Sequence, residues 1–393
     1  MSRIDELIAE LCPEGVEFKE LGEVAQLQRG TSITSKDIKD GYIPVIAGGQ
    51  QPAYFHNVSN RDGETIVVAG SGAYSGFVSY WVKPIFVSDA FSVKPDNSVL
   101  LTKYAFYFLK ENQTALHDLK RGGGVPHVYA KDISPMKVPI PPLEIQREIV
   151  RVLDTFTRLE SELESELEAR RRQHQYYRDR LLSFESGRQD ISRIDDLIAE
   201  LCPEGVEFKT LANVAAYSVT RINASDLDET TFVGVDNLLP NMAGKTNATY
   251  TANTARLTAY EIGDILLGNI RPYLKKIWLA SNSGGCSGDV LAVRIAEAHR
   301  PALMPEFLYR LLASEDFFTY NMKYAKGAKM PRGSKEAILK YRIPIPPLEI
   351  QREIVRVLDT FTRLEAELKT ELKTRQRQYQ HYRDRLLTFQ EAA

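Results

Sequence analysis

The chain has 393 residues, a length that suggests two or three domains, and its 43% hydrophobic and 26% charged residues are the average of globular proteins. This composition excludes a disordered or collagen-like chain, and no apolar run approaches the roughly 20 residues of a membrane span. Charges in the first ten residues argue against a signal peptide. Cys12, Cys202 and Cys286 are too scattered for a disulfide framework or a four-ligand zinc site. We therefore expect a cytoplasmic protein without a membrane segment.

The first residues belong to a segment that occurs twice. Residues 2–25 match residues 192–215 at 20 of 24 positions, and residues 139–184 match residues 344–389 at 37 of 46 positions. The chain is thus a tandem duplication, in which a short block, a variable insert and a long block are followed by the same order again. Two nearly constant frames that hold two different inserts suit a molecule that recognises two different things.

The two inserts are expected to be mixed α/β domains. The first alternates short β-branched and aromatic runs with glycine-rich turns, and then has a helical pattern at residues 104–119. The second insert follows the same plan, with a helical pattern at residues 306–322. Similar stretches at Gly63 and Gly263, at Asp89 and Asp289, and at Gly122 and Gly327 indicate common ancestry of the inserts, and chance similarity is the alternative.

Each long block predicts an uninterrupted helix after a Pro-Ile-Pro-Pro segment. Between residues 143 and 184 there is no Pro or Gly, and apolar residues recur at spacings of three and four. A helix of about 40 residues is about 60 Å long, and a coiled coil of the two copies would cover both apolar stripes. Two separate surface helices are the alternative. The leucines expected on the contact stripes of the spacer helices are Leu159, Leu163, Leu167, Leu364, Leu368 and Leu372.

Positive charge is concentrated in the inserts. Residues 26–136 have 11 Lys and Arg against 9 Asp and Glu, residues 216–341 have 15 against 12, and the rest of the chain is acidic. Loops at 120–127, 269–276 and 323–332 combine basic residues with Gly, Tyr and Asn, which can contact phosphates and base edges. A solvated basic turn is the alternative for any one residue. The candidate DNA contacts are Arg29, Ser71, Tyr74, Lys120, Arg121, His127, Asn269, Arg271, Tyr273, Lys275, Lys276, Lys326, Lys329 and Arg332.

No catalytic or metal-binding motif is complete. Residues 243–246 end like a phosphate-binding loop, but Leu239 stands where the first glycine is needed. Glu17 and Glu207 begin Glu-Phe-Lys stretches of the kind found in nucleases, yet no Pro-Asp precedes them at strand spacing. The six histidines have no metal-ligand spacing. We predict no catalytic residue, no metal and no cofactor in this chain.

Two Ile-Pro-Pro-Leu-Glu-Ile-Gln stretches, at residues 140–146 and 345–351, each follow a variable insert and open a long helix. Together with the Gly-Asp-Ile-Leu-Leu-Gly-Asn-Ile-Arg-Pro stretch at 263–272, they resemble the specificity subunit (HsdS) of type I restriction–modification systems, and the resemblance covers essentially the whole chain. It implies an α+β fold with a pseudo-two-fold internal duplication. Two α/β target recognition domains are joined by two long antiparallel helices that form a coiled-coil spacer.

The resemblance also implies a function and a set of partners. Each recognition domain would read one half of an asymmetric bipartite target in double-stranded DNA, while the helices set the spacer and dock two modification (methyltransferase) subunits. Restriction subunits, which are ATP-dependent translocases and nucleases, would join the assembly. S-adenosylmethionine, ATP and Mg²⁺ are implied for those partners only, and this chain would be non-catalytic. The expected segments are a short repeat at 1–25, recognition domain 1 at 26–138, a central region with a long helix at 139–191, the second short repeat at 192–215, recognition domain 2 at 216–343 and the C-terminal helix at 344–393.

Two other classes of protein remain as alternatives. A single-chain nuclease or methyltransferase would show activity alone, which the missing motifs argue against. A pure assembly scaffold would bind protein through its inserts and would show no salt-dependent binding to duplex DNA.

Overall fold

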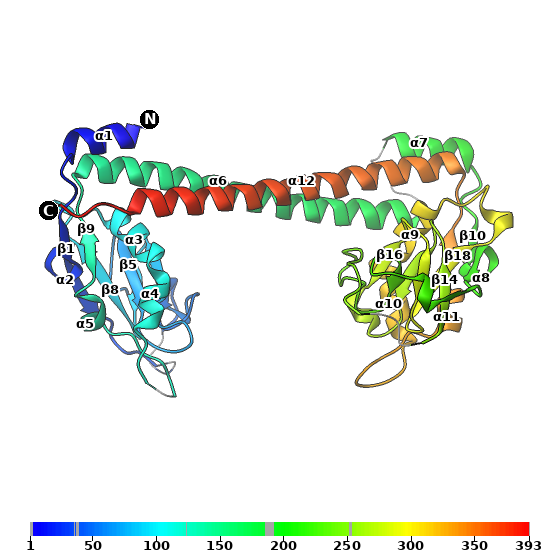
Figure 1. Cartoon of the computed structure of the whole chain (residues 1–393), viewed down its shortest axis with the longest axis horizontal. Helices are drawn as coiled ribbons and strands as arrows, with labels where there is room; N and C mark the ends of the chain where they lie inside the picture. The colour runs from blue at the N-terminus through cyan, green and yellow to red at the C-terminus, as the bar shows by residue number, and fades with distance from the viewer. Residues whose placement is uncertain are drawn as a thin grey trace. The chain divides into compact units, whose positions relative to one another are not determined.

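The computed structural model describes residues 3–34, 36, 39–122, 124–184, 192–250 and 254–392 (Figure 1). The chain divides into two compact units, residues 1–165 with 369–393 (unit 1) and residues 166–368 (unit 2). Each unit combines a short block and an insert with segments of both long blocks. Residues 185–191, which the sequence assigns to the end of the central region, lie outside the described residues.

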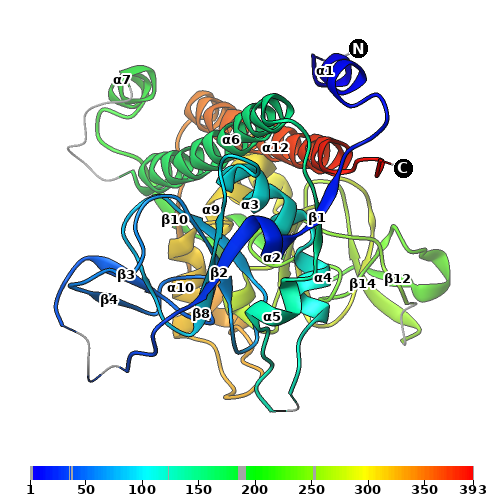
Figure 2. The ribbon, with the colours of Figure 1, turned by 90° about the vertical axis from the view of Figure 1, so that its left-hand side faces the viewer.

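The first insert is built on a four-stranded antiparallel sheet. Its strand order is β2-β8-β5-β6, and β5 (Thr65–Ala69) is buried along its whole length because its Thr-Ile-Val-Val-Ala sequence suits a central strand. In Figure 2 the β3–β4 hairpin and α4 lie on opposite sides of β8. The elements up to the first long helix are α1 (Arg3–Leu11), β1 (Phe18–Glu20), α2 (Leu21–Val24), β2 (Ala25–Arg29), β3 (Ile43–Ile46), β4 (Tyr54–His56), β5, β6 (Val78–Trp81), β7 (Phe86–Val87), β8 (Ala90–Pro95), α3 (Thr102–Glu111), α4 (Gln113–Asp118), α5 (Ala130–Ile133) and β9 (Lys137–Pro139).

The second insert repeats this plan. Its main sheet has the order β11-β18-β15-β16, which corresponds strand for strand to the sheet of the first insert. The elements between the two long helices are α7 (Ser192–Leu201), β10 (Phe208–Thr210), α8 (Leu211–Val214), β11 (Ala215–Tyr217), β12 (Arg221–Asn223), η1 (Ala224–Asp226), β13 (Phe232–Val233), β14 (Arg256–Tyr260), β15 (Ile265–Gly268), η2 (Pro272–Leu274), β16 (Ile277–Leu279), β17 (Gly284–Cys286), β18 (Val290–Ile295), η3 (Glu297–His299), α9 (Pro305–Leu312), α10 (Glu315–Lys323), α11 (Lys335–Leu339) and β19 (Arg342–Pro344).

The inserts differ most in their small sheets. The first insert has a three-stranded sheet of order β4-β3-β7, and the second has a four-stranded sheet of order β12-β14-β17-β13. Each contains one parallel pair, β3 with β7 and β13 with β17. In both units a short antiparallel pair, β1 with β9 or β10 with β19, joins the short block to the strand before the long helix. The inserts therefore differ mainly in their small sheets, while the main sheets and the short strand pairs correspond.

The single helix expected in each insert is in fact two helices. In the first insert α3 and α4 meet at Asn112, whose ψ of 20° interrupts the helix and whose side chain donates to the Phe108 carbonyl. In the second insert α10 starts anew because the Ser314 hydroxyl accepts from the Phe317 amide. Apolar periodicity continues across both breaks, so the helical pattern alone did not reveal them.

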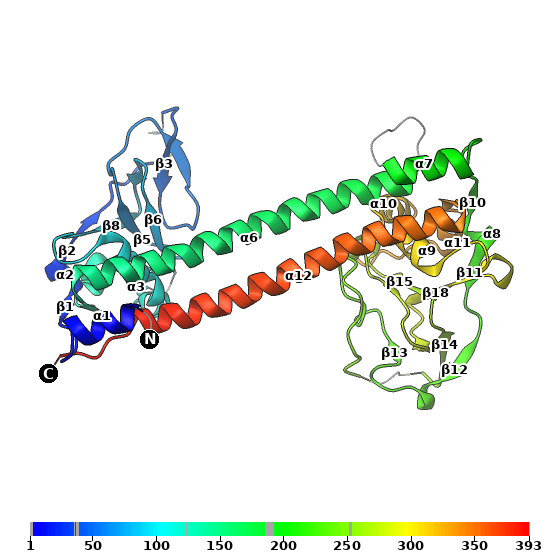
Figure 3. The ribbon, with the colours of Figure 1, turned by 90° about the horizontal axis from the view of Figure 1, so that it is seen from above.

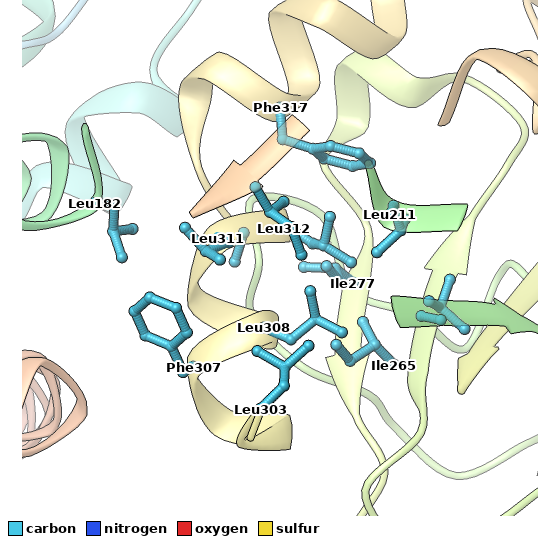
Figure 4. Packing of buried hydrophobic residues seen from close by; sticks show 14 of the residues in the cluster. Leu182, Leu211, Ile265, Ile277, Leu303, Phe307, Leu308, Leu311, Leu312 and Phe317 are labelled. Atoms are coloured by element: carbon cyan, nitrogen blue, oxygen red, sulfur yellow. The ribbon is translucent and has the colours of Figure 1, made fainter. Parts of the chain in front are cut away.

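The core of each insert includes the start of a long helix. Leu303, Leu308 and Leu312 of unit 2 pack toward Ile265 and Ile277 of the sheet (Figure 4). The same cluster contains three residues from the first turns of α12, Ile350, Ile354 and Leu358, all fully buried. In unit 1 the corresponding residues of α6 are Ile145, Ile149 and Leu153.

The two long helices, α6 (Leu143–Ser183) and α12 (Leu348–Leu387), pack antiparallel (Figures 1 and 3). In unit 1 the Phe156 ring lies 5.3 Å from the Tyr382 ring, and in unit 2 the Phe361 ring lies 5.3 Å from the Tyr177 ring. The predicted pairing of the helices is thus confirmed, and separate surface helices are excluded. Of the six stripe leucines, Leu167 is buried and the other five are half-buried.

The short blocks pack on the ends of the long helices. In unit 1 the α1 residue Ile4 shares a core with Leu386 and Leu387 at the end of α12. In unit 2 the α7 residue Ile194 shares a core with Leu181 and Leu182 at the end of α6. In unit 1 the first short block therefore packs against the end of α12, which lies at the far end of the chain.

Candidate nucleic-acid interface

A buried glutamine fixes each insert to its long helix. Gln146, the last residue of the first Ile-Pro-Pro-Leu-Glu-Ile-Gln stretch, is fully buried; its Oε1 accepts from the Leu101 amide at 2.8 Å, and its Nε2 donates to the carbonyls of Val99 and Pro141. Gln351 makes the same three bonds, to Met304, Ala302 and Pro346. The stretch that carries the resemblance is thus a structural joint between the insert and the helix.

A second set of contacts joins the first helix of each insert to an aspartate of the long helix. In unit 1 Asp154 accepts from the Tyr107 hydroxyl at 2.5 Å and pairs with Lys103 at 2.8 Å. In unit 2 Arg310 pairs with Asp359, and its other nitrogen lies 3.4 Å from the Thr362 hydroxyl. The long helices have an aspartate at the same place, Asp154 and Asp359, whereas the inserts contact it with different residues.

In unit 1 two loops that are far apart in sequence lie side by side. The first, residues 70–76, we call the tyrosine loop of unit 1, and the second, residues 121–122 and 124–127, we call its hairpin. The Gly72 amide donates to the Pro126 carbonyl at 3.0 Å, and Val128 donates to the Gly70 carbonyl at 3.0 Å. Arg121 and His127 close the hairpin with two reciprocal backbone bonds of 2.9 Å. These bonds form one surface from the two loops.

Unit 2 reproduces this arrangement bond for bond. Its tyrosine loop is residues 269–275, and its hairpin is residues 326–332. The Arg271 amide donates to the Pro331 carbonyl at 2.8 Å, and the Gly333 amide donates to the Asn269 carbonyl at 3.1 Å. Lys326 and Arg332 close the hairpin with two reciprocal bonds of 2.9 Å. The equivalence of the two surfaces follows from these backbone bonds, because the loop sequences share almost nothing.

An acidic residue supports each surface through a different partner. Asp89 accepts from the Ser71 hydroxyl in unit 1. Asp289 accepts from Arg332 Nε at 3.2 Å in unit 2. The sequence paired these two aspartates but gave no sign that they lie under the loops.

The predicted contact residues therefore gather on two surfaces. Those of unit 1 come from the tyrosine loop, the hairpin and its flank, and Arg29 lines a small cavity together with His127. Those of unit 2 come from the equivalent loops. The residues classed as exposed on the two surfaces are Arg29, Tyr74, Arg121, Arg271, Tyr273, Lys326, Lys329 and Arg332.

Some of the predicted cations are engaged within the protein. Lys275 lies 2.6 Å from the Glu315 carboxylate, and Lys276 Nζ donates to the Val235 carbonyl at 2.7 Å. Arg121 pairs with Asp132 at 2.8 Å, and Lys120 Nζ lies 3.3 Å from the Ala73 carbonyl. Lys275 thus holds the end of the tyrosine loop of unit 2 to α10.

Asn269 does not belong to the exposed set, which corrects the sequence prediction. Its side chain is 5% exposed, and its Oδ1 has no hydrogen-bond partner among the described residues. Asn269 directly follows β15, a fully buried strand. Its side chain lies next to Gly333, the residue that follows the hairpin. The sequence pattern could not show this because the residue lies in a basic, polar run.

Sequence reasoning missed one feature of the hairpins. Val125 and Met330 occupy equivalent places before the proline of each hairpin and are 56% and 46% exposed. An exposed apolar side chain between basic residues can contact a thymine methyl group. The sequence offered a weak signal, the Val-Pro and Met-Pro pairs at the same offset.

The described residues contain no group of three or more His, Cys, Asp or Glu that could hold a metal ion. Burial raises the pKa of the Cys286 thiol to about 12, and it also raises the pKa values of the Cys12 and Cys202 thiols. A thiol with a raised pKa is a poor nucleophile at neutral pH. No helix in the described part of the chain is long and apolar enough to cross a membrane.

The comparisons with known proteins agree on one family. The family model described as the type I restriction modification DNA specificity domain matches residues 13–169 and 294–374, and the chain belongs to that family. It is accordingly a specificity subunit of a type I restriction–modification system. The match includes the first insert, the last part of the second insert and the first part of each long helix.

Curated relatives span nearly the same length as this chain. It is similar to the type I restriction enzyme EcoR124I/EcoR124II specificity subunit of Escherichia coli, at 26% identity over 95% of this chain and 94% of that protein. A putative specificity subunit, S.HindORF215P of Haemophilus influenzae, is 25% identical over 95% of this chain and 96% of that protein.

Solved structures share the fold. The S subunit of a type I restriction–modification system from M. genitalium matches with a TM-score of 0.65 and 18% identity, over 95% of this chain and 96% of that chain. A second solved chain matches with a TM-score of 0.57 and 16% identity, over 95% of this chain and 97% of that chain. Its structure is described as showing the structural basis of complex assembly and conformational transition of the type I R-M system.

Proposed function

We propose that the two loop–hairpin surfaces bind double-stranded DNA and that each reads one half of an asymmetric bipartite target. The observation that carries this proposal is the pair of identical backbone frames with unlike side chains. A common frame would present each surface to the duplex in the same way, while different side chains would select different bases. This chain then contributes recognition and no catalytic step.

The duplicated frame supports the proposal that this chain binds two modification subunits. The short blocks and the first turns of the long helices are nearly identical in the two units, which suits two copies of one modification subunit. In this proposal the modification and restriction subunits carry out methyl transfer, ATP-driven translocation and cleavage. They also bind S-adenosylmethionine, ATP and Mg²⁺.

DNA binding is tested with the full chain assembled with its modification subunits. Binding to a duplex should weaken as salt rises, since phosphate contacts release counterions from DNA. Salt-independent binding, or none, would favour a scaffold whose inserts bind protein.

The division of labour is tested by exchanging one insert. Replacement of residues 26–136 by the insert of a relative should change one half of the motif that the complex methylates in a cell, as read by methylome sequencing. A change in both halves would show that the two domains read the target jointly.

The long helices are proposed to set the distance between the half-sites. Residues 163–166 are one copy of a tandem Leu-Glu-Ser-Glu unit, and residues 368–371 are their equivalents in α12. Deleting both segments shortens each helix by about 6 Å and rotates the following part by about 40°. Since base pairs are about 3.4 Å apart, the unread spacer should shorten by one or two base pairs with both half-sites kept. A folded deletion complex that methylates the original motif would exclude this role.

A further inference from the structure

One side chain is common to the two tyrosine loops. Residues 70–76 read Gly-Ser-Gly-Ala-Tyr-Ser-Gly, and residues 269–275 read Asn-Ile-Arg-Pro-Tyr-Leu-Lys. At equivalent positions only the tyrosine is identical, as Tyr74 and Tyr273. Their exposures are 47% and 49%. Neither tyrosine is needed to fill the core, because about half of each side chain is open to solvent.

The backbone around the tyrosine is also held constant. Gly72 and Gly76 have φ values of 82° and 86°, and their equivalents Arg271 and Lys275 have φ values of 55° and 51°. Glycine adopts such left-handed conformations readily, whereas for arginine and lysine they cost about 1 kcal/mol. Unit 2 keeps the loop shape without glycine, so the shape itself is under constraint.

Support from neighbouring side chains stabilises this unfavourable backbone in unit 2. The Lys275 ammonium is held by both oxygens of Glu315, at 2.6 and 2.7 Å. The Arg271 amide is held by the Pro331 carbonyl of the hairpin. Tyr273 lies between these two anchors, so the loop is held on both sides of the tyrosine.

A cation accompanies the tyrosine in both units. The first residue of each hairpin is basic, Arg121 in unit 1 and Lys326 in unit 2, and both are exposed. Each is joined to the tyrosine loop through its hairpin partner, since His127 pairs with Ser71 and Arg332 pairs with Ile270. Arg121 also pairs with Asp132, but 67% of its side chain remains exposed. Each surface therefore carries a phenol hydroxyl and a basic side chain, and both kinds of group donate to phosphates.

The two half-sites of an asymmetric target share the sugar–phosphate backbone, whatever their base sequences. Residues that read bases have to differ between the units, and those that position the units on DNA can be the same. We propose that Tyr74 and Tyr273 are positioning residues whose hydroxyl groups each donate a hydrogen bond to a DNA phosphate. This inference rests on the proposed function of the loop–hairpin surfaces, and it makes these tyrosines independent of base sequence.

The test removes the hydroxyl groups alone. Tyr74→Phe and Tyr273→Phe are prepared in the full chain, assembled with its modification subunits, and titrated with two duplexes. One duplex carries the motif that the wild-type complex methylates, and the other has a random sequence. Each substitution should weaken binding to both duplexes by the same factor, about 3- to 10-fold, and leave the methylated motif unchanged.

Salt dependence gives a second readout. A neutral hydroxyl displaces no counterion, so the Tyr→Phe variants should keep the wild-type salt slope. Lys326→Ala should reduce that slope by about 1. Matched controls are Tyr54→Phe and Tyr250→Phe, at tyrosines that are 43% and 48% exposed but lie outside the two surfaces. Both controls should bind as the wild type does.

Two outcomes would overturn the inference. A loss confined to the motif duplex, or a changed motif, would make the tyrosines base-reading residues, and unchanged binding to both duplexes would remove them from the interface. Charge reversal at Arg121 and Lys326 to Glu separates this failure from failure of the proposed function. If that variant binds DNA normally, the surfaces are not the interface; if it binds weakly while the tyrosine variants bind normally, only the tyrosine inference is wrong.

Discussion

The two inserts present the same backbone at the candidate interface but support it with different interiors. In unit 1 Val128 is 1% exposed and lies beside Gly70, and the last turn of α4 contributes Leu116, which is fully buried. In unit 2 Gly333 occupies the position that Val128 has in unit 1. A Cβ there would lie 2.4 Å from Asn321 Oδ1 and 2.9 Å from Asn269 Oδ1.

Small and large residues have thus exchanged places between the units. Unit 1 combines Gly70 with a valine, and unit 2 combines Asn269 with Gly333, so one side chain fills the space in each case. The exchange has a cost in unit 2, because neither polar atom of the Asn321 side chain has a partner among the described residues. The comparison shows that the loop surface is preserved by its backbone bonds while the packing behind it is free to change.

The largest effect is expected at the joint that the two units have in common. Gln146→Ala leaves the Leu101 amide and two carbonyls without their buried partner, and should destabilise unit 1 by about 2–4 kcal/mol. Gln351→Ala should destabilise unit 2 by a similar amount, because its three bonds are equivalent. Calorimetry of the full chain measures both. A loss below about 0.5 kcal/mol would show that the glutamine is not the joint between insert and helix.

A smaller loss of stability is expected from Gly333→Val, which imposes the side chain of unit 1 on unit 2. Overpacking against the two asparagines should cost about 2 kcal/mol. The triple variant Asn269→Gly, Asn321→Leu and Gly333→Val reproduces the interior of unit 1 and should recover most of that loss. If the triple variant is no more stable than the single one, the two interiors are not interchangeable solutions for one frame.

The contrast between Arg332 and its equivalent His127 gives the next prediction. Arg332→Ala should weaken binding by about 1–3 kcal/mol if the side chain contacts a base, and only through the half-site that unit 2 reads. His127→Ala should affect the other half-site. Titration with duplexes mutated in one half at a time measures the two effects. Equal losses on all duplexes would assign Arg332 to phosphates.

The smallest effect is expected from His174, a half-buried histidine of the helix pair in unit 2. His174 in unit 2 stands where unit 1 has Tyr379. Burial lowers the pKa of His174, Arg178 and Arg310 lower it further, and the hydrogen bond from its Nδ1 to Glu365 at 2.7 Å partly opposes this. Arg171 lies at the edge of the same carboxylate. The folded state therefore disfavours the protonated ring.

The sign of the pH dependence follows from linkage. As pH falls below about 6.5, the unfolded chain binds a proton that the folded one resists, so unit 2 should lose stability. His174→Tyr should remove this loss, and Tyr379→His should introduce it in unit 1. Melting curves at pH 7.5 and 5.5 should show shifts of no more than a few degrees. A wild-type protein whose melting temperature rises on acidification would contradict this.

The sequence by itself determined the duplication, the long helices and the family. These follow from identity between segments and from a 3.6-residue apolar period, which depend on neighbours along the chain. The signature stretch was also visible, although its use was not. Only the structure shows that Gln146 is buried with three bonds, because two of its three partners, Val99 and Leu101, lie more than 40 residues away.

The tertiary structure decided which loop residues share a surface. Tyr74 and Tyr273 lie at equivalent places because backbone amides and carbonyls join each tyrosine loop to a hairpin about 60 residues later in the chain. Backbone groups are the same in every residue except proline, so such pairing leaves no trace in residue type. Burial removed Asn269 from the surface for a similar reason. An asparagine after a buried strand is directed by the strand, and its polarity does not decide on which side it lies.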